Sequence, residues 1–406
     1  MRTFSYFLFL ILLLTSCADP PAPAVHTAPA IPSIIIQTPP ACTMLQVEPT
    51  PGPDTPSLFP PESPTDRVRG ADQPIVTITE YSDYQDVRSA LLAEAIDKLL
   101  KEHPDEVRVV SRIFPLISVN DKAALAAQAA QAAAEQDQFW EMHRLLYAQQ
   151  ESWIALSVDE FEEWLSAQAS ALGMDVDQFE ADLKREDIVA SVQEAWESGQ
   201  KIGLPGTPLL LINGQIYGGP RDYSSLNDII QLIALGERQF KACPPLSVQP
   251  NKQYIATLET EKGDIVIQLF ADKAPITVNS FLFLARSGWY DDITFHRVMP
   301  DLFAQTGDPS GTGKGNPGYY VKTEIDPSLT FDKPGMVAMV NSGPDTSGSQ
   351  FFITYVPTTQ YNGQYTIFGE VLSGMDVLKQ LKPRDAQPGS NTPPGDKLLG
   401  ITVEER

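Results

Sequence analysis

Three cysteines, Cys17, Cys42 and Cys243, are the side chains whose type and spacing bear most directly on chemistry. They are too few to build a disulfide scaffold, and no two of them form a Cys-x-x-Cys pair. Thiol–disulfide exchange needs a nucleophilic thiolate and a second thiol close to it. Residues 71–242 contain no cysteine, so the sequence excludes dithiol redox chemistry in that stretch.

The residues before Cys17 have the pattern of a secretion signal. Arg2 precedes an apolar run over 4–14, which would make about 16 Å of helix, half of a ~30 Å bilayer core. Leu-Thr-Ser-Cys at 14–17 also resembles the bacterial lipobox, in which the cysteine is acylated and becomes the new N-terminus. This implies a lipoprotein signal peptide at 1–17 and an anchor in a bacterial membrane outside the cytoplasm. A plain signal peptide with an incidental cysteine is the alternative.

Residues 18–70 have the composition of a tether. They include 14 prolines in 53 positions, which leaves too few backbone donors for a helix or a sheet. We expect a semi-rigid spacer that reaches at most about 160 Å. With Cys17 acylated, two cysteines remain in an oxidising compartment. We therefore predict a disulfide between Cys42 and Cys243, and two free thiols are the alternative.

Charge and length limit the classes of function. The chain has 29 Lys+Arg and 52 Asp+Glu, a formal net charge of −23, which repels phosphate backbones and argues against nucleic-acid binding. Its 406 residues suggest two or three domains. His103 and His143 are isolated from other candidate ligands, so we assign no metal.

Residues 71–242 alternate strands and helices in the order of an α/β domain. Apolar alternation predicts strands at 75–80 and 107–113, and Asp86 opens a helix between them. A long Ala-rich helix is predicted from Asp121 to about Gln149.

Four motifs in this stretch are Glu80-Tyr81-Ser82-Asp83-Tyr84-Gln85, Phe114-Pro115-Leu116, Phe139-Trp140-Glu141-Met142-His143 and Gly206-Thr207-Pro208. They resemble the DsbA-like branch of the thioredoxin family, which implies that fold. Cys-x-x-Cys follows the glutamine in the family, whereas Asp, Val, Arg and Ser occupy 86–89 here. The resemblance also implies a cis bond at Thr207-Pro208, beside a groove that presents backbone to extended peptide. A redox-inactive peptide-binding domain and a simple spacer both remain open.

Residues 253–406, after a linker at 243–252, contain many short strand-like runs that Gly and Pro turns interrupt. With a helix that begins at Pro275, this pattern predicts a closed β-barrel with flanking helices. The motifs here are Phe295-His296-Arg297-Val298-Met299-Pro300, Gln305-Thr306-Gly307-Asp308, Asn341-Ser342-Gly343-Pro344, Gly348-Ser349-Gln350-Phe351-Phe352-Ile353 and Phe368-Gly369-Glu370-Val371. They resemble the cyclophilin family.

The resemblance implies a cofactor-free peptidyl-prolyl cis-trans isomerase. Rotation about an Xaa-Pro bond crosses a barrier of ~20 kcal/mol and needs no nucleophile. An apolar slot for the ring and a donor aimed at the imide nitrogen lower that barrier. Arg297 is the implied catalytic donor. The implied substrate-binding residues are Phe303, Gln305, Val340, Asn341, Gln350, Phe352, Tyr361 and Tyr365.

Several positions depart from the family's usual pattern. Leu302-Phe303 stands where Phe-Met is usual, and Val340 replaces a smaller alanine. Gln360 and Tyr361 replace a Trp-Leu or His-Leu pair, and Tyr365 replaces a histidine. These replacements keep aromatic surface and a hydroxyl donor at the pocket rim, and they leave the substrate preference and the turnover rate open. The sequence thus predicts a membrane-tethered isomerase that assists folding of exported proteins with Xaa-Pro bonds, its partners being those proteins and, through Cys17, a lipid bilayer. The alternative is a non-catalytic chaperone or scaffold whose two domains bind proline-containing or extended chain.

Overall fold

The computed structural model describes residues 41–45, 59–385 and 392–406. The predicted signal peptide, the acylation at Cys17 and much of the predicted tether lie outside the described residues. No helix in the described part of the chain is long and apolar enough to cross a bilayer. Two groups of hydrophobic clusters define an N-terminal domain, from residue 59 to the first turns of α8 (Tyr223–Arg238), and a C-terminal domain after it.

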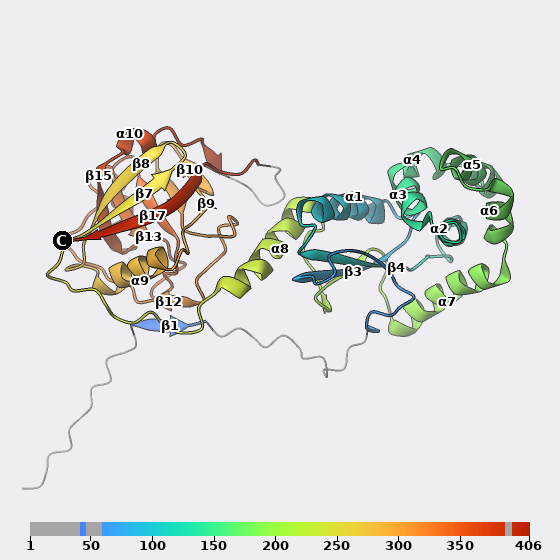
Figure 1. Ribbon diagram of the computed structural model, residues 1–406, viewed down its shortest axis with the longest axis horizontal. Helices are drawn as coiled ribbons and strands as arrows, with labels where there is room; N and C mark the ends of the chain where they lie inside the picture. The colour runs from blue at the N-terminus through green and yellow to red at the C-terminus, as the bar shows by residue number, and fades with distance from the viewer. Residues whose placement is uncertain (1–40, 46–58, 386–391) are drawn as a thin grey trace, which may run out of the picture. The chain divides into compact units, whose positions relative to one another are not determined.

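A five-stranded sheet forms the centre of the N-terminal domain (Figure 1). Its strands, in order across the sheet, are β2 (Arg67–Gly70), β4 (Val107–Ile113), β3 (Val76–Ser82), β5 (Leu209–Ile212) and β6 (Gln215–Ile216). The β3 and β4 strands run parallel and the other pairs run antiparallel. Because β2 pairs with β4, folded structure begins before residue 71, inside the segment expected to be tether.

Helices cover this sheet and extend beside it. Val76 and Ile78 of β3 pack with apolar residues of α8 and of α1 (Val87–Glu102), which begins at the predicted cap Asp86. The remaining helices are α2 (Ala123–Ala134), α3 (Phe139–Ala148), α4 (Gln150–Trp153), α5 (Val158–Ala171), α6 (Val176–Leu183) and α7 (Glu186–Ile202). They enclose a second apolar cluster rich in alanine and aromatic side chains.

The long Ala-rich helix predicted from Asp121 to Gln149 is two helices in the structure. The α2 helix ends at Ala134, and α3 begins at Phe139. Asp137 adopts a left-handed φ of 57° between them, which no α-helix accommodates. The break lets Phe139 turn back into the same apolar cluster as α2.

The C-terminal domain is built on a curled ten-stranded sheet (Figure 1). Its strands, in order, are β16 (Arg384–Asp385), β10 (Arg297–Met299), β11 (Phe303–Thr306), β14 (Phe351–Thr354), β13 (Met336–Met339), β15 (Ile367–Ser373), β8 (Gly263–Leu269), β7 (Tyr254–Thr260), β17 (Lys397–Glu405) and β9 (Ile293–Thr294). The helices α9 (Pro275–Arg286) and α10 (Met375–Leu378) flank it, together with a 3₁₀ turn, η1 (Thr359–Tyr361).

The prediction of a closed barrel is wrong, because the sheet is curled but open. Its ladder ends at β16 on one side and at β9 on the other, and no pairing among the described strands joins these ends. The chain itself passes from β9 to β10 through Phe295 and His296. Their backbone groups bind elsewhere: Phe295 N donates to Asp396 O, and His296 O accepts from Arg384 Nε. These contacts take the place of a closing ladder.

Two distant segments are fastened to the C-terminal domain. The β1 strand (Cys42–Met44) pairs antiparallel with β12 (Tyr319–Val321). Cys42 forms a disulfide with Cys243, as expected, with the two Cα atoms 5.9 Å apart. In the segment expected to be a linker, Ser247 N and Val248 N donate to Asn279 Oδ1. Residues 243–248 therefore lie against this domain.

Candidate active site

A row of side chains crosses five neighbouring strands on the sheet face opposite the main core of the C-terminal domain. Read from the edge strand, the row is Asp385, Arg297, Gln305, Phe352 and Ala338. Side chains alternate between the two faces of a strand, so the strand neighbours of these residues point into the core. These inward-facing neighbours are Val298, Ala304, Val337 and Ile353. The alternation thus places a cation, an amide and an aromatic ring side by side.

An apolar cluster surrounds Phe352, which is 4% exposed. Its ring centroid lies 5.4 Å from Phe303 and 5.9 Å from Phe331, with the Phe331 ring stacked. Tyr365 and Tyr361 meet Phe352 edge-on at 5.3 and 6.0 Å. The structure therefore brings Phe303, Phe352, Tyr361 and Tyr365 together, and it adds Phe331. No motif signals Phe331, because this residue lies in a loop outside the recognised motifs.

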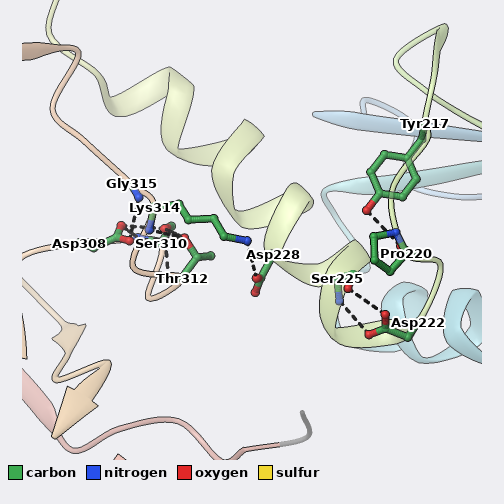
Figure 2. A network of polar contacts seen from close by, with 10 residues as sticks. All are labelled: Tyr217, Pro220, Asp222, Ser225, Asp228, Asp308, Ser310, Thr312, Lys314 and Gly315. Atoms are coloured by element: carbon green, nitrogen blue, oxygen red, sulfur yellow. Dashed lines mark hydrogen bonds and ion pairs between the residues drawn. The ribbon is translucent and has the colours of Figure 1, made fainter. Parts of the chain in front are cut away.

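The polar side of the row is held by the loop after β11. Gln305 Nε2 donates to Gln350 Oε1 at 2.9 Å, and Gln350 Nε2 donates to the carbonyls of Gly313 and Gly315. The fully buried Asp308 closes this loop by accepting from the backbone nitrogens of Ser310 and Gly315 (Figure 2). The loop carbonyls thus orient Gln350, and Gln350 orients Gln305.

Arg297 lies at the edge of the apolar cluster. Its Nε donates to Asp385 Oδ1 at 2.8 Å, and its guanidinium carbon lies 5.3 Å from the centroid of the Phe303 ring. The Arg297 side chain is 43% exposed, so a ligand over Phe352 can reach it. The sequence did not single out Asp385, because β16 is two residues long and follows an irregular segment.

Val340 and Asn341 follow β13 and border the same cluster. Val340 N donates to Gln350 O at 2.8 Å, and Val340 packs on the cluster. Asn341 Nδ2 donates to Gln364 O at 2.9 Å, while its Oδ1 accepts from Gly343 N. These bonds fix the Asn341 side chain, so its backbone is the part available to a bound chain.

The electrostatics of this face suit binding better than proton transfer. Burial raises the pKa of Tyr361, the neighbouring Tyr365 raises it further and Arg297 partly offsets the rise, so its hydroxyl stays protonated at neutral pH. His296 is 6% exposed, and burial lowers the pKa of its imidazole. The face thus offers an apolar surface, neutral hydroxyl and amide groups, and one permanent cation.

The N-terminal domain carries a second candidate site at the start of α1. Asp86 Oδ1 accepts from Arg88 N at 3.0 Å, and Asp86 Oδ2 accepts from Thr207 Oγ1 at 2.7 Å. The Thr207-Pro208 bond is cis. A cleft of about 590 Å³ adjoins Pro208; its lining includes Leu91, Lys98, Pro220 and Tyr223. Leu91 is 63% exposed, and no cysteine is present among residues 59–242.

Comparisons with known proteins assign both domains. The family model "Cyclophilin type peptidyl-prolyl cis-trans isomerase/CLD" matches residues 255–403, and the model "Thioredoxin" matches residues 62–232. "Peptidyl-prolyl cis-trans isomerase-like 1" of Homo sapiens is 45% identical over 143 residues, which are 34% of this chain and 84% of that protein. The chain belongs to the cyclophilin-type peptidyl-prolyl cis-trans isomerase family.

Other relatives match the same cyclophilin-type domain. "Peptidyl-prolyl cis-trans isomerase-like 1" of Gibberella zeae is 44% identical over 127 residues, which are 30% of this chain and 78% of that protein. A solved cyclophilin type isomerase of Cryptosporidium parvum is 32% identical, with a TM-score of 0.35; the match covers 38% of this chain and 98% of that one. The two family models together show that the protein combines a thioredoxin-like domain with a cyclophilin-type isomerase domain.

Proposed function

We propose that the row Arg297, Gln305 and Phe352 is the active site of the isomerase. The proline ring of the substrate lies on Phe352 and Phe303, and Gln305 binds the substrate main chain with the backbone of Asn341. The main observation behind this proposal is the strand register, which places Arg297 beside Gln305 and Gln305 beside Phe352. Val340, Gln350, Tyr361 and Tyr365 complete the substrate-binding set.

Arg297 would act by stabilising the twisted amide. The lone pair of the imide nitrogen localises only when the bond twists, so a guanidinium N–H binds the transition state more strongly than the ground state. Removal of one such donor typically costs about 10²-fold in rate. Arg297 has this capacity because its guanidinium borders the apolar cluster and remains partly exposed.

An isomerase assay on Xaa-Pro peptides tests this assignment. Arg297→Ala should lower kcat/KM about 10²-fold, as expected for a lost transition-state donor. Arg286→Ala is the matched control, since Arg286 is a similarly exposed arginine at the end of α9 in the same domain. Equal rates for Arg297→Ala and the control would remove Arg297 from the mechanism.

We infer further that the protein works outside the cytoplasm on exported proteins and is anchored by lipid at Cys17. The apolar run before Cys17 and the lipobox-like Leu-Thr-Ser-Cys support this inference. Since β1 and the disulfide fasten residue 42 to the C-terminal domain, only the 24 residues 18–41 separate Cys17 from the isomerase, at most about 90 Å of chain. The isomerase would thus be held near the membrane surface.

Labelling cells with a radioactive fatty acid tests the anchor. The wild-type protein should take up the label and sediment with membranes, and Cys17→Ser should do neither. A label on Cys17→Ser, or an unlabelled wild type, would contradict the assignment. The folding role is checked by the refolding rate of a proline-limited exported protein, which should rise with the wild type and not with Arg297→Ala.

The cleft beside Pro208 supports a second candidate function, binding of extended polypeptide by the thioredoxin-like domain. Exposed Leu91 and the apolar faces of Pro220 and Tyr223 line the cleft, and positions 86–89 carry no thiol. Leu91→Asp should weaken binding of a fluorescent unfolded polypeptide that lacks proline. Val119→Asp, at another exposed apolar position of this domain, is the control. If both variants bind the unfolded polypeptide equally well, the cleft is not its binding site and the domain acts as a spacer.

A further inference from the structure

The Arg297 guanidinium is oriented by two contacts that come from different strands. Arg297 and Asp385 are partners in the β10–β16 ladder, and Asp385 Oδ1 accepts from Nε at 2.8 Å. The Phe303 ring, two ladder positions along β11, lies 5.3 Å from the guanidinium carbon. A hydrogen bond through Nε and a ring contact together restrain both the direction and the plane of the guanidinium.

The Asp385 bond leaves the outer part of the guanidinium for a ligand. A guanidinium has five N–H donors, and the bond to Asp385 uses the one on Nε. In the described part of the chain neither terminal nitrogen of Arg297 has a hydrogen-bond partner. These terminal nitrogens are therefore the donors that a twisted imide nitrogen would meet.

Asp385 also changes the charge at the site. Its carboxylate is 44% exposed and contacts the only cation of the row, so a substrate meets a nearly neutral pair instead of an isolated positive charge. The carboxylate is held in place by its strand, because Arg384 beside it pairs with Val298 and donates from Nε to His296 O.

We propose that Asp385 is a positioning and specificity residue of the isomerase. Its carboxylate orients Arg297 through Nε, and it keeps the site from favouring acidic side chains next to the substrate proline. The substrates that fit this site are Xaa-Pro segments with neutral or basic flanking residues. The proposal rests on the proposed role of Arg297, and it adds Asp385 as the residue that orients the Arg297 guanidinium.

Two variants separate positioning from charge. Asp385→Ala removes both the acceptor and the charge, and Asp385→Asn keeps an acceptor at the same place without the charge. On a neutral Xaa-Pro peptide we expect kcat to fall about fivefold for Ala and about twofold for Asn, with KM little changed. Glu404→Gln is the control, since Glu404 of β17 forms an exposed ion pair with Arg406 in the same domain.

The charge effect is measured with a pair of peptides that differ only in Glu or Lys before the proline. The Glu-to-Lys ratio of kcat/KM should rise about threefold in both Asp385 variants. Salt at 1 M should abolish the rise, because exposed charges are screened over about 3 Å at that concentration. A structural role of Asp385 alone would not move this ratio.

A double-mutant cycle makes the outcomes distinguishable. Asp385→Ala should have no effect on the rate in the Arg297→Ala background, because Asp385 acts through Arg297. If Arg297→Ala is slow while both Asp385 variants match the wild type in rate and in peptide ratio, this proposal is wrong and the role of Arg297 stands. If Arg297→Ala retains the wild-type rate, the role of Arg297 and this proposal are both wrong. A fivefold loss that persists in the Arg297→Ala background also overturns the proposal.

Discussion

The stability of the thioredoxin-like domain should depend on the ionisation of one buried glutamate, Glu80. Glu80 occupies a core position of β3, on the same face as Val76 and Ile78, and it is 1% exposed. Neither of its carboxylate oxygens has a hydrogen-bond partner among the described residues. Burial raises the pKa of Glu80 to about 7; the nearby Ser111 hydroxyl and Arg69 offset part of the rise. We expect Glu80→Gln to stabilise this domain at alkaline pH.

The size of the effect follows from the pKa difference. A carboxyl with a raised folded-state pKa binds its proton more tightly when folded, so the protein loses stability as the pH rises from 4.5 to about 7. A pKa raised from 4.5 to about 7 lowers the free energy of unfolding by about 3 kcal/mol above pH 7. At pH 5 the loss is about 1 kcal/mol or less, because the carboxyl is still protonated in the folded protein. Glutamine does not ionise, so Glu80→Gln should gain about 2 kcal/mol relative to the wild type between pH 5 and pH 8.

Urea unfolding at pH 5 and pH 8, followed by tryptophan fluorescence, measures this gain. Four of the five tryptophans, Trp140, Trp153, Trp164 and Trp196, lie in the thioredoxin-like domain. Glu163→Gln, at an exposed position of α5, is the matched control. A difference between Glu80→Gln and the wild type that does not change with pH would refute the reasoning, because it would mean that Glu80 does not titrate in this range.

Two further predictions concern acid stability and the disulfide. Burial lowers the pKa of His143 to about 3, so the thioredoxin-like domain should lose stability as the pH falls from 6.5 towards 3. His143→Asn, which keeps an acceptor near Tyr84, should flatten that loss in urea unfolding at pH 4 and pH 7. The double variant Cys42→Ser/Cys243→Ser reopens a loop of 201 residues, which the chain-entropy model values at up to about 5 kcal/mol. The double variant should therefore lose its isomerase activity at a lower urea concentration than the wild type. Equal urea midpoints for the loss of activity in the two proteins would contradict the prediction.

Much of the site followed from motifs, because the residues that form it lie on short strands with fixed alternation. Arg297, Gln305 and Phe352 are in separate motifs, and the strand register brings them into one row. Asp385 and Phe331 were missed, since each lies in an irregular stretch and reaches the site through tertiary structure alone.

The errors in the fold have local causes. The helix break at Asp137 depends on a left-handed residue that nothing in the alanine pattern signals. The open sheet was unpredictable because its edge strands β9 and β16 have two residues each, too few for a periodic pattern. The β2 strand lies next to a proline-rich stretch, and its four residues bury little apolar surface. The composition of this region therefore gives no sign of a strand.

The rate of cis–trans exchange in an Xaa-Pro peptide tests the central claim most directly. Two-dimensional NMR exchange spectra resolve the two isomers of a short peptide, whose uncatalysed exchange takes tens to hundreds of seconds. A catalytic amount of the wild-type protein should produce exchange peaks within a sub-second mixing time. An equal amount of Arg297→Ala should produce none. Exchange peaks of equal intensity with both proteins, or none with the wild type, would contradict the account.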